Sequence, residues 1–251
     1  MKVSVITVCF NSEKYISECI KSVSTQKLKD VEHIFIDGKS KDRTLDIIKK
    51  LSKKNSILIS EPDNGIYDAM NKGIRIAKGE LICFLNSDDL FASKDVLEVV
   101  YASFKNTKKH VIWGDLVIVN RERINEKLRK IKREKIHKKD ILMGSAPPHP
   151  SFFVSKVILD SISNYNLKYK VASDFDLMKR ALERVNYDGL YINKLTTIMR
   201  YGGLSNSDLA TLVKGNLEII DSLKSSYSEF NFLKFIFFKL RQTIREKFFC
   251  N

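Results

Sequence analysis

The sequence is poor in the residues and runs that mark specialised classes of protein. Its 251 residues include 10 glycines and 4 prolines, which excludes collagen-like and low-complexity chains. No stretch approaches the roughly 18 uninterrupted apolar residues of a membrane-spanning helix. Hydrophobic residues make up 43% of the chain, too many for intrinsic disorder. We therefore expect a globular chain, long enough for one sizeable core.

Cysteines are few and scattered. None of the four forms a CxxC pair, and Cys9 and Cys83 lie in apolar runs; the other two are Cys19 and Cys250. This pattern indicates reduced core thiols in a cytosolic protein rather than a disulfide framework or a zinc site. Only about eight mostly apolar residues precede Asn11, and no small-residue cleavage site follows them, so we expect no secretory signal.

Acidic residues are scarce in two segments. The chain has 44 Lys and Arg against 30 Asp and Glu, a net charge of +14. Residues 121–139 hold ten basic residues against three glutamates, and residues 231–249 hold five against one. These two segments therefore supply most of the excess charge. Such segments suit nucleic acid, anionic lipid or phosphorylated substrates, and a solvated helix face is the alternative for either one.

The first ninety residues alternate between strand and helix patterns. Apolar, β-branched runs predict buried strands at 3–10, 31–37, 57–60 and 80–85, with helices between them. Short connections favour a Rossmann-like, mainly parallel sheet flanked by helices. Asn11 and Ser12 are expected to cap the first helix, and Gly79 to end the third. Later segments are less regular: helices fit 94–105, 174–185, 207–224 and 231–249, and strands fit 110–119 and a run ending near Tyr201.

Polar side chains follow each of the four predicted strands, at the edge where ligands of open α/β sheets bind. The first strand–helix turn has no glycine, which argues against a GxGxxG site and a P-loop, since both need backbone amides close to a phosphate. A nucleotide bound here would need its phosphates neutralised by a divalent metal held by carboxylate. Asp88 and Asp89 fit that role; the alternative is that Asp89 caps the next helix and Asp88 is solvated.

Four motifs in this order resemble glycosyltransferase family 2, whose members have the GT-A fold. They are SVITVCFN, IDGKSKDRT, SEPDNGIYDAMNKGI and GELICFLNSDD, within residues 3–92. A closer similarity, to bacterial exopolysaccharide transferases of the colanic acid type, extends through PPHPSFF, YKVASDFDLMKRAL and GGLS. The resemblance implies an α/β GT-A domain over 1–225, with a nucleotide-sugar-binding half at 1–92 and an acceptor-binding half at 93–225. A basic amphipathic helix is expected at 226–251.

The resemblance also implies which residues bind a nucleotide-sugar donor. Asn86, Ser87 and Asp88 stand where the family has its DxD triplet, with Asn86 in place of the first aspartate. Asp88 would bind Mg²⁺ or Mn²⁺ and, through it, the diphosphate. Asp42 and Thr44 match a family turn, although helix capping explains Asp42 as well. The remaining donor-site residues implied are Thr7, Phe10, Asn11, Asp37, Asp63, Asn64, Gly65, Asn71 and His149.

Asp174 stands where the family has the general base of an inverting, in-line displacement, which needs no nucleophilic Ser or Cys. It follows Ser173, where the family has a glutamate, and it begins a predicted helix, so a plain N-cap is the alternative. Asp176 is the fallback base. Arg180 would lie near the site or pair with Asp176 at i, i+4, and Arg200 would neutralise a phosphate.

The C-terminal segment predicts an amphipathic helix. Its apolar stripe consists of Phe232, Leu233, Ile236, Leu240 and Ile244. The helix is too short and too charged to span a bilayer, but fits one lying in an anionic membrane interface. The alternative is a helix packed on the catalytic domain.

The resemblance implies a lipid-linked saccharide acceptor and a cytoplasmic protein peripheral on the inner face of the plasma membrane. The rival hypotheses are a nucleotidyltransferase, a catalytically degenerate scaffold and a nucleic-acid-binding protein. The nucleotidyltransferase would need a Gly-rich first turn, and VCFNSEKY has none. The nucleic-acid hypothesis lacks aromatic platforms within residues 121–139, so we expect no nucleic-acid partner.

Overall fold

The computed structural model describes residues 1–202 and 209–248, and within them one mixed sheet of nine strands. The order is β3-β2-β1-β4-β8-β6-β9-β5, with β7 paired to β6 beside this path. The strands are β1 (Val3–Cys9), β2 (Val31–Asp37), β3 (Ile57–Ser60), β4 (Leu81–Phe84), β5 (Leu90–Phe91), β6 (Val111–Val119), β7 (Lys127–Ile131), β8 (Phe152–Ser155) and β9 (Leu190–Arg200).

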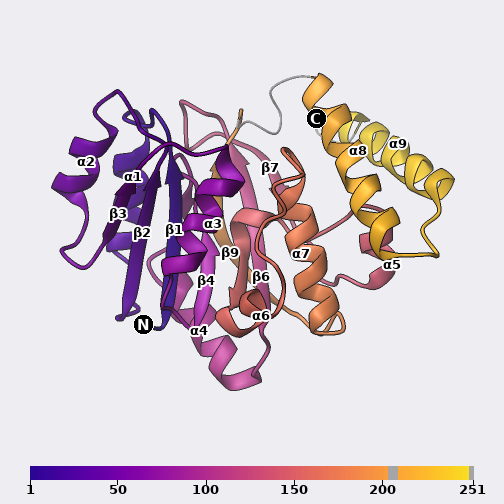
Figure 1. Ribbon diagram of the computed structural model, residues 1–251, viewed down its shortest axis with the longest axis horizontal. Coiled ribbons are helices and arrows are strands. Elements are labelled where there is room, and N and C mark those ends of the chain that lie inside the picture. Colours follow the sequence, from indigo (N-terminus) through magenta and orange to yellow (C-terminus); the bar gives the residue numbers. More distant parts are fainter. Residues whose placement is uncertain (203–208, 249–251) are drawn as a thin grey trace.

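The first four strands are parallel, as the sequence predicts. Helices α1 (Ile16–Ser24), α2 (Thr44–Leu51) and α4 (Val96–Thr107) pack on one face of the sheet, and α3 (Ile66–Ile76) packs on the other (Figure 1). A Cβ on Gly73 would lie 2.5 Å from Ile6 Cγ2, so glycine allows α3 to approach β1 closely. Gly79 does not end this helix: α3 stops at Ile76, and a Cβ on Gly79 would lie 2.4 Å from the backbone nitrogen of Ser4.

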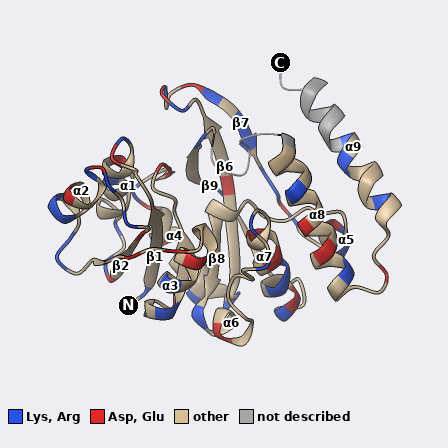
Figure 2. Cartoon of the chain, turned by 45° about the horizontal axis from the view of Figure 1, so that its top comes forward, with Lys and Arg blue, Asp and Glu red and all other residues tan. Residues whose placement is uncertain are grey.

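The second half of the sheet is mixed rather than parallel. Strand β8 runs antiparallel to both β4 and β6, β9 runs parallel to β6, and β5 runs antiparallel to β9. Strand β7 lies within the basic segment 121–139 and pairs antiparallel with β6, so this segment is in part an edge strand (Figure 2). Because β4 pairs with β8, the two predicted halves share one continuous sheet.

The remaining helices pack on the α3 face of the sheet and at its end. They are α5 (Lys138–Leu142), α6 (Lys156–Ser161), α7 (Ser173–Arg184), α8 (Leu209–Ser226) and α9 (Phe232–Phe248), with a 3-10 turn at His149–Ser151. Figure 1 shows α8 and α9 beyond α7, at the end of the molecule away from α2. Phe235 on α9 is fully buried in the core that α7 and α8 share. No helix among the described residues is long and apolar enough to cross a membrane.

Three of the four cysteines lie in the core. Cys9, Cys19 and Cys83 are free and buried, and burial raises the pKa of each thiol. They are therefore protonated, unreactive core residues, as predicted. Cys250 lies outside the described residues.

Candidate active site

The loops after β1 and β2 are tied together at the carboxyl edge of the parallel strands. Asn11, with a φ of 48°, accepts a hydrogen bond at Oδ1 from Lys41 N at 3.0 Å and donates its own N–H to Ser40 Oγ at 2.8 Å. It therefore does not cap α1, which begins at Ile16 without a side-chain cap. Asp42 accepts the N–H groups of Thr44 and Glu13, so it both serves the start of α2 and joins the two loops.

Phe10, Gly38 and Asp63 meet at this edge, from three successive strand ends. Phe10 is 61% exposed there. A Cβ on Gly38 would lie 2.6 Å from Asp63 Oδ2 and 3.4 Å from Phe10 Cδ2. Asp63 Oδ1 accepts the N–H of Gly65, which takes a φ of 108° and begins α3. An exposed aromatic ring beside a carboxylate forms a surface on which a planar base can stack.

Asp37 lies beneath that surface and is fully buried. Its carboxylate accepts hydrogen bonds from the hydroxyls of Ser40 and Ser60, the latter at 2.7 Å, and from Ser40 N at 3.0 Å. The nucleotide-contact role implied by the resemblance stays a prediction. In this structure the carboxylate joins the ends of β2 and β3. Asn64 is exposed, and its N–H donates to Asp68 Oδ2 at 3.0 Å.

Two residues expected at the donor site lie in the interior. Thr7 is fully buried and shares a 2.9 Å hydrogen bond with His33 Nε2. Asn71 is 7% exposed, and its side chain bonds both the N–H and the C=O of Tyr165, at 2.8 and 2.9 Å. The structure therefore does not bring Thr7 to the exposed edge, and it uses Asn71 to hold the chain before α7 against α3.

The segment Asn86–Asp89 follows β4, as predicted, and its two aspartates differ. Asp89 is 1% exposed; it accepts from Asn86 Nδ2 at 3.1 Å and from Arg200 N at 3.3 Å. Burial and the neighbouring Asp88 raise the pKa of Asp89. It does not cap the next helix, since α4 begins at Val96. Ser87 Oγ lies 2.8 Å from Ser12 Oγ, which joins this segment to the β1 loop.

Asp88 is partly exposed and pairs with Arg121, whose Nη1 lies 3.1 Å from Asp88 Oδ2. The guanidinium of Arg121 also lies 4.9 Å from the centroid of the Tyr15 ring. Arg200 contacts the same ring at 4.7 Å, and it donates to Arg121 O at 3.0 Å and to Glu18 Oε1 at 2.8 Å. Arg200 is 4% exposed, and its hydrogen bond to Arg121 O supports the Arg121 turn from inside the protein.

Asp174 is half-buried in the first turn of α7, facing α3. Tyr67 on α3 donates its hydroxyl to Val171 O at 2.7 Å and lies 3.3 Å from Asp174 Oδ1. Phe175 N also donates to Oδ1, at 2.7 Å. Among the described residues, Phe175 N is the donor to Oδ1 and the Tyr67 hydroxyl lies beside the same oxygen, which leaves Oδ2 open to accept a proton.

His149 lies under the same region. It is 9% exposed, its ring stacks on Phe84 at 5.4 Å, and its Nε2 lies 2.6 Å from the hydroxyl of Tyr165. Burial lowers its pKa, although Asp174 opposes this. His149, expected among the donor-site residues, is therefore buried by the 3-10 turn, and its role there stays a prediction.

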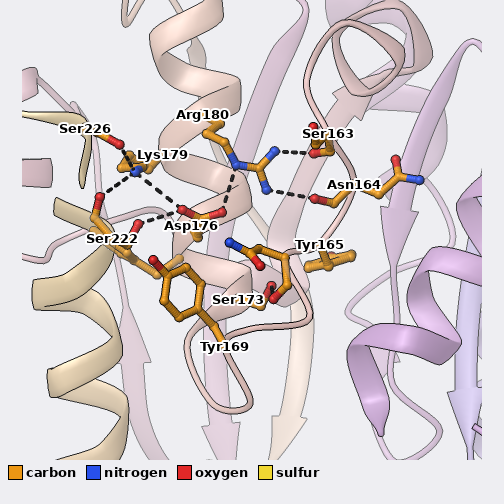
Figure 3. A network of polar contacts seen from close by, with 12 residues as sticks. Ser163, Asn164, Tyr165, Tyr169, Ser173, Asp176, Lys179, Arg180, Ser222 and Ser226 are labelled. Carbon is orange, nitrogen blue, oxygen red and sulfur yellow. Dashed lines mark hydrogen bonds and ion pairs between the residues drawn. The ribbon is translucent and has the colours of Figure 1, made fainter. Parts of the chain in front are cut away.

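Asp176, the fallback base, belongs to a closed network (Figure 3). Arg180 Nε lies 2.8 Å from Oδ2, and Ser222 Oγ and Lys179 Nζ lie 2.6 and 3.4 Å from Oδ1. Burial opposes ionisation of Asp176, but the hydrogen bond from Ser222 and the two cations outweigh it and lower the pKa. Arg180 also donates to the backbone of Ser163 and Asn164. Asp176 therefore anchors α7 to α8 and to the preceding loop.

The chain matches a known family over most of these elements. Residues 4–159 match the family model for glycosyl transferase family 2. The chain belongs to this family. A relative, an uncharacterized glycosyltransferase of Mycobacterium tuberculosis, is 32% identical over 183 residues, which is 71% of this chain and 68% of the relative. A PGL/p-HBAD biosynthesis glycosyltransferase of the same species is 27% identical over 209 residues, 81% of this chain and 79% of that one.

A solved structure confirms the fold. The structure of S. aureus TarS 1-349 in complex with UDP-GlcNAc superposes with a TM-score of 0.66 at 20% sequence identity, covering 98% of this chain and 81% of that one. The α/β fold with its mixed sheet is thus the GT-A fold of family 2 glycosyltransferases, as expected.

Family 2 enzymes with this fold commonly use a divalent metal. Among the described residues, no group of three or more His, Cys, Asp and Glu side chains is gathered to hold one. Asp88 nevertheless fits as a single ligand: its hard carboxylate is partly exposed, and the Arg121 guanidinium already holds the place of a cation beside it. Mg²⁺ and Mn²⁺ sites of this kind take most of their other ligands from phosphate and water.

The sequence did not single out Tyr15, Tyr67, Tyr165 or Arg121 as site residues. Tyr67 lies within the SEPDNGIYDAMNKGI motif, so the family resemblance carried a signal for it. Arg121 is the first of ten basic residues in its segment, and nothing in that run distinguishes it. Gly203, Leu204 and Ser205 of the GGLS motif lie outside the described residues.

Proposed function

We propose that this protein is an inverting glycosyltransferase of cell-surface polysaccharide synthesis, close to the colanic acid type. Its donor is a nucleotide sugar, a UDP-sugar by preference, and its acceptor is a saccharide linked to polyprenyl diphosphate. The TarS structure is a complex with UDP-GlcNAc, and the mycobacterial relative is named for PGL/p-HBAD biosynthesis. The first supports a nucleotide-sugar donor, and the second supports a role in glycan synthesis.

The contact between Tyr67 and Asp174 carries this proposal. It connects the nucleotide half, which supplies Tyr67 from α3, to the carboxylate that begins α7. Asp174 therefore lies near the carboxyl edge of the sheet with one carboxylate oxygen open. A general base at this edge can contact an acceptor hydroxyl. Asp176 is excluded by its network, because a carboxylate held by two cations and a hydroxyl has no open oxygen to offer.

In the proposed reaction, the base of the nucleotide stacks on Phe10, with Asp63 beside it. The acceptor hydroxyl attacks the anomeric carbon on the face opposite the diphosphate, and Asp174 Oδ2 accepts its proton as the glycosidic bond forms. Asp88 would hold a divalent metal, which would supply positive charge against the charge that develops on the departing diphosphate. Phe175 N orients Asp174 by donating to Oδ1, and the Tyr67 hydroxyl lies beside the same oxygen.

Asn86 supports an active enzyme rather than a degenerate scaffold. Its amide donates a hydrogen bond to the buried Asp89. An ionised aspartate at position 86 could not donate this bond, and it would place a third carboxylate against Asp88 and Asp89. The change from the family's first aspartate therefore stabilises the loop that carries Asp88.

We place the protein in the cytoplasm, peripheral on the inner face of the plasma membrane. On α9, Leu233, Phe237 and Leu240 are 77%, 68% and 59% exposed and recur at helical spacing. Lys138, at the end of the basic segment 121–139, pairs with Glu229 just before α9 at 2.5 Å. The end of the basic segment 121–139 is therefore tied to the chain just before α9. A basic helix with an exposed apolar stripe suits an anionic bilayer surface.

The test is donor turnover by the purified full chain with Mn²⁺ and a panel of UDP- and GDP-sugars, followed as release of the nucleoside diphosphate. Asp174→Asn should lose at least ~10²-fold in turnover, the scale of a positioned general base. Asp160→Asn, an exposed aspartate paired with Lys156, is the matched control and should keep full turnover. Turnover by Asp174→Asn equal to that of the control would refute the assignment of the base.

A further inference from the structure

Arg121 occupies the cation position at Asp88, yet several other contacts hold it there. It follows β6 in a tight turn: Asn120 Oδ1 accepts the N–H groups of Glu122 and Arg123 at 3.0 and 3.2 Å, and Asn120 N donates to Glu126 O. Besides Asp88, its guanidinium contacts the Tyr15 ring and lies 3.4 Å from Tyr201 O. The next side chain, Glu122, accepts from Tyr15 Oη at 2.8 Å and Lys14 Nζ at 2.7 Å.

These contacts keep Arg121 at the edge of the site whether or not it pairs with Asp88. The backbone carbonyl of Arg121 is bound by the buried Arg200, which fixes the turn from the opposite side. If the Asp88 pair breaks, the guanidinium is still held by the aromatic face of Tyr15 and by the carbonyl of Tyr201. The side chain therefore stays within reach of whatever binds at Asp88.

We infer that Arg121 is an exchangeable counter-ion: it neutralises Asp88 when no donor is bound, and passes to the donor diphosphate when a divalent metal takes its place. This inference rests on the proposed function. The side chains of Arg121 and Asp88 are 39% and 22% exposed, so the pair is of the partly solvated kind that is easily broken. A guanidinium released beside a diphosphate has the planar fork that phosphate oxygens accept.

The exchange gives Arg121 two opposite effects on binding. Without nucleotide, Arg121 competes with the metal for Asp88, so removing it should tighten the binding of Mn²⁺ alone by about two- to fivefold, the range for an exposed ion pair. With nucleotide, Arg121 contributes a charge-assisted hydrogen bond, so removing it should weaken the binding of UDP or GDP in Mn²⁺ by about tenfold. If Arg121 only repelled metal, removing it would weaken the binding of neither Mn²⁺ nor nucleotide. If it only supported the fold, removing it would weaken the binding of both.

The experiment measures Mn²⁺ binding by electron paramagnetic resonance and binding of UDP and of GDP, each with Mn²⁺, by calorimetry. The variants are Arg121→Gln and Arg121→Lys in the full chain. Arg123→Gln is the matched control: it lies two residues along the same turn, is 72% exposed, and pairs with Glu126 away from Asp88. Arg121→Lys keeps the charge but loses the fork, so it should bind Mn²⁺ like the wild type and bind the nucleotide more weakly.

Opposite shifts for Arg121→Gln, with no shift for Arg123→Gln, are the expected result. Shifts of the two affinities in the same direction, or an Mn²⁺ affinity unchanged by Arg121→Gln, overturn the exchange. Should Arg121→Gln fail to fold, an Mn²⁺ affinity changed by Arg121→Lys overturns it equally. A wild type that binds neither UDP nor GDP in Mn²⁺ refutes the proposed function instead, and the titrations with Mn²⁺ alone still decide whether Arg121 competes for Asp88.

Discussion

Asp174 and Asp176 are two residues apart on α7, and their surroundings give them different tasks. Asp174 faces α3 and keeps one carboxylate oxygen open, whereas Asp176 faces α8 and is closed in by Arg180, Lys179 and Ser222. Sequence spacing alone left both as candidate bases. The difference arises from the helical period, which turns neighbouring positions toward different partners.

Replacing Asp176 should therefore damage the fold. Asp176→Asn leaves Lys179, which is 1% exposed, without its counter-charge, and we expect the free energy of unfolding to fall by about 3 kcal/mol. Asp174→Asn should change it by less than about 0.5 kcal/mol, because its carboxylate is not part of a buried ion pair. Urea unfolding of the two variants at pH 7 measures both values; equal stabilities would contradict this division.

The same network predicts a dependence on pH. Because the pKa of Asp176 is lower in the folded chain than the ordinary 3.8, its ionised form stabilises the protein fully above that pH. This contribution disappears as the pH falls from 3.8 through the lowered pKa. The stability difference between wild type and Asp176→Asn should therefore be constant near neutral pH and shrink below about pH 4. A difference that grows on acidification would show that the carboxylate is not the stabilising form.

At the scale of elements, α9 has two faces with different roles. Phe235 is fully buried, and a Cβ on Gly144 would lie 2.6 Å from its ring, so this face is part of the core. Leu233, Phe237 and Leu240 face outward. The alternative of a helix packed on the domain is thus confirmed for one face of α9, and membrane binding by the exposed face stays a prediction. Deleting residues 230–251 is no clean test of membrane binding, because it would also remove Phe235 from the core.

Membrane binding is better tested on the exposed face. The triple variant Leu233→Ser, Phe237→Ser, Leu240→Ser should reduce co-sedimentation with anionic liposomes by at least about tenfold, since each of these side chains would otherwise be buried in the interface. Salt should weaken binding by the wild type. The control replaces Leu51, Val157 and Leu167 by serine, three exposed apolar residues elsewhere. Equal liposome binding by both triple variants would exclude α9 as the contact.

For the whole molecule, the strands of the first 92 residues could be predicted because β1, β2 and β4 are almost entirely buried and, like the partly buried β3, consist largely of apolar and β-branched residues. Strands β6 and β9 were also predicted, as a strand over 110–119 and a run ending near Tyr201. Strands β5, β7 and β8 were not: β5 has two residues, β7 is a charged and mostly exposed strand, and β8 follows a Pro-rich loop. The positions of β5 and β8 depend on pairing with strands far away in the sequence, which local sequence does not encode.

The candidate site, like the fold, could be predicted from the sequence only in part. Asp63 and Asp88 follow the ends of β3 and β4, and Asp174 lies in the first turn of α7, as the sequence predicted; their roles stay predictions. Thr7 and Asn71 do not reach the exposed edge. The motif could not show this, because it does not tell which side of a buried strand or helix faces the ligand. Arg121 reaches Asp88 only through the pairing of β6 with β9, which brings Tyr201 and Arg121 together.

The central claim is that the edge around Phe10, Asp63 and Asp88 binds a nucleoside diphosphate through a divalent metal. Calorimetric titration of UDP and GDP in Mn²⁺ tests it most directly, using the wild type, Asp88→Asn and Asp174→Asn. We expect at least one of the two nucleotides to bind the wild type and Asp174→Asn equally, and to bind Asp88→Asn at least about tenfold more weakly, because that variant keeps the shape of the side chain but loses the charge that holds the metal. Nucleotide binding that is unaffected by Asp88→Asn, or absent from the wild type, would contradict the account.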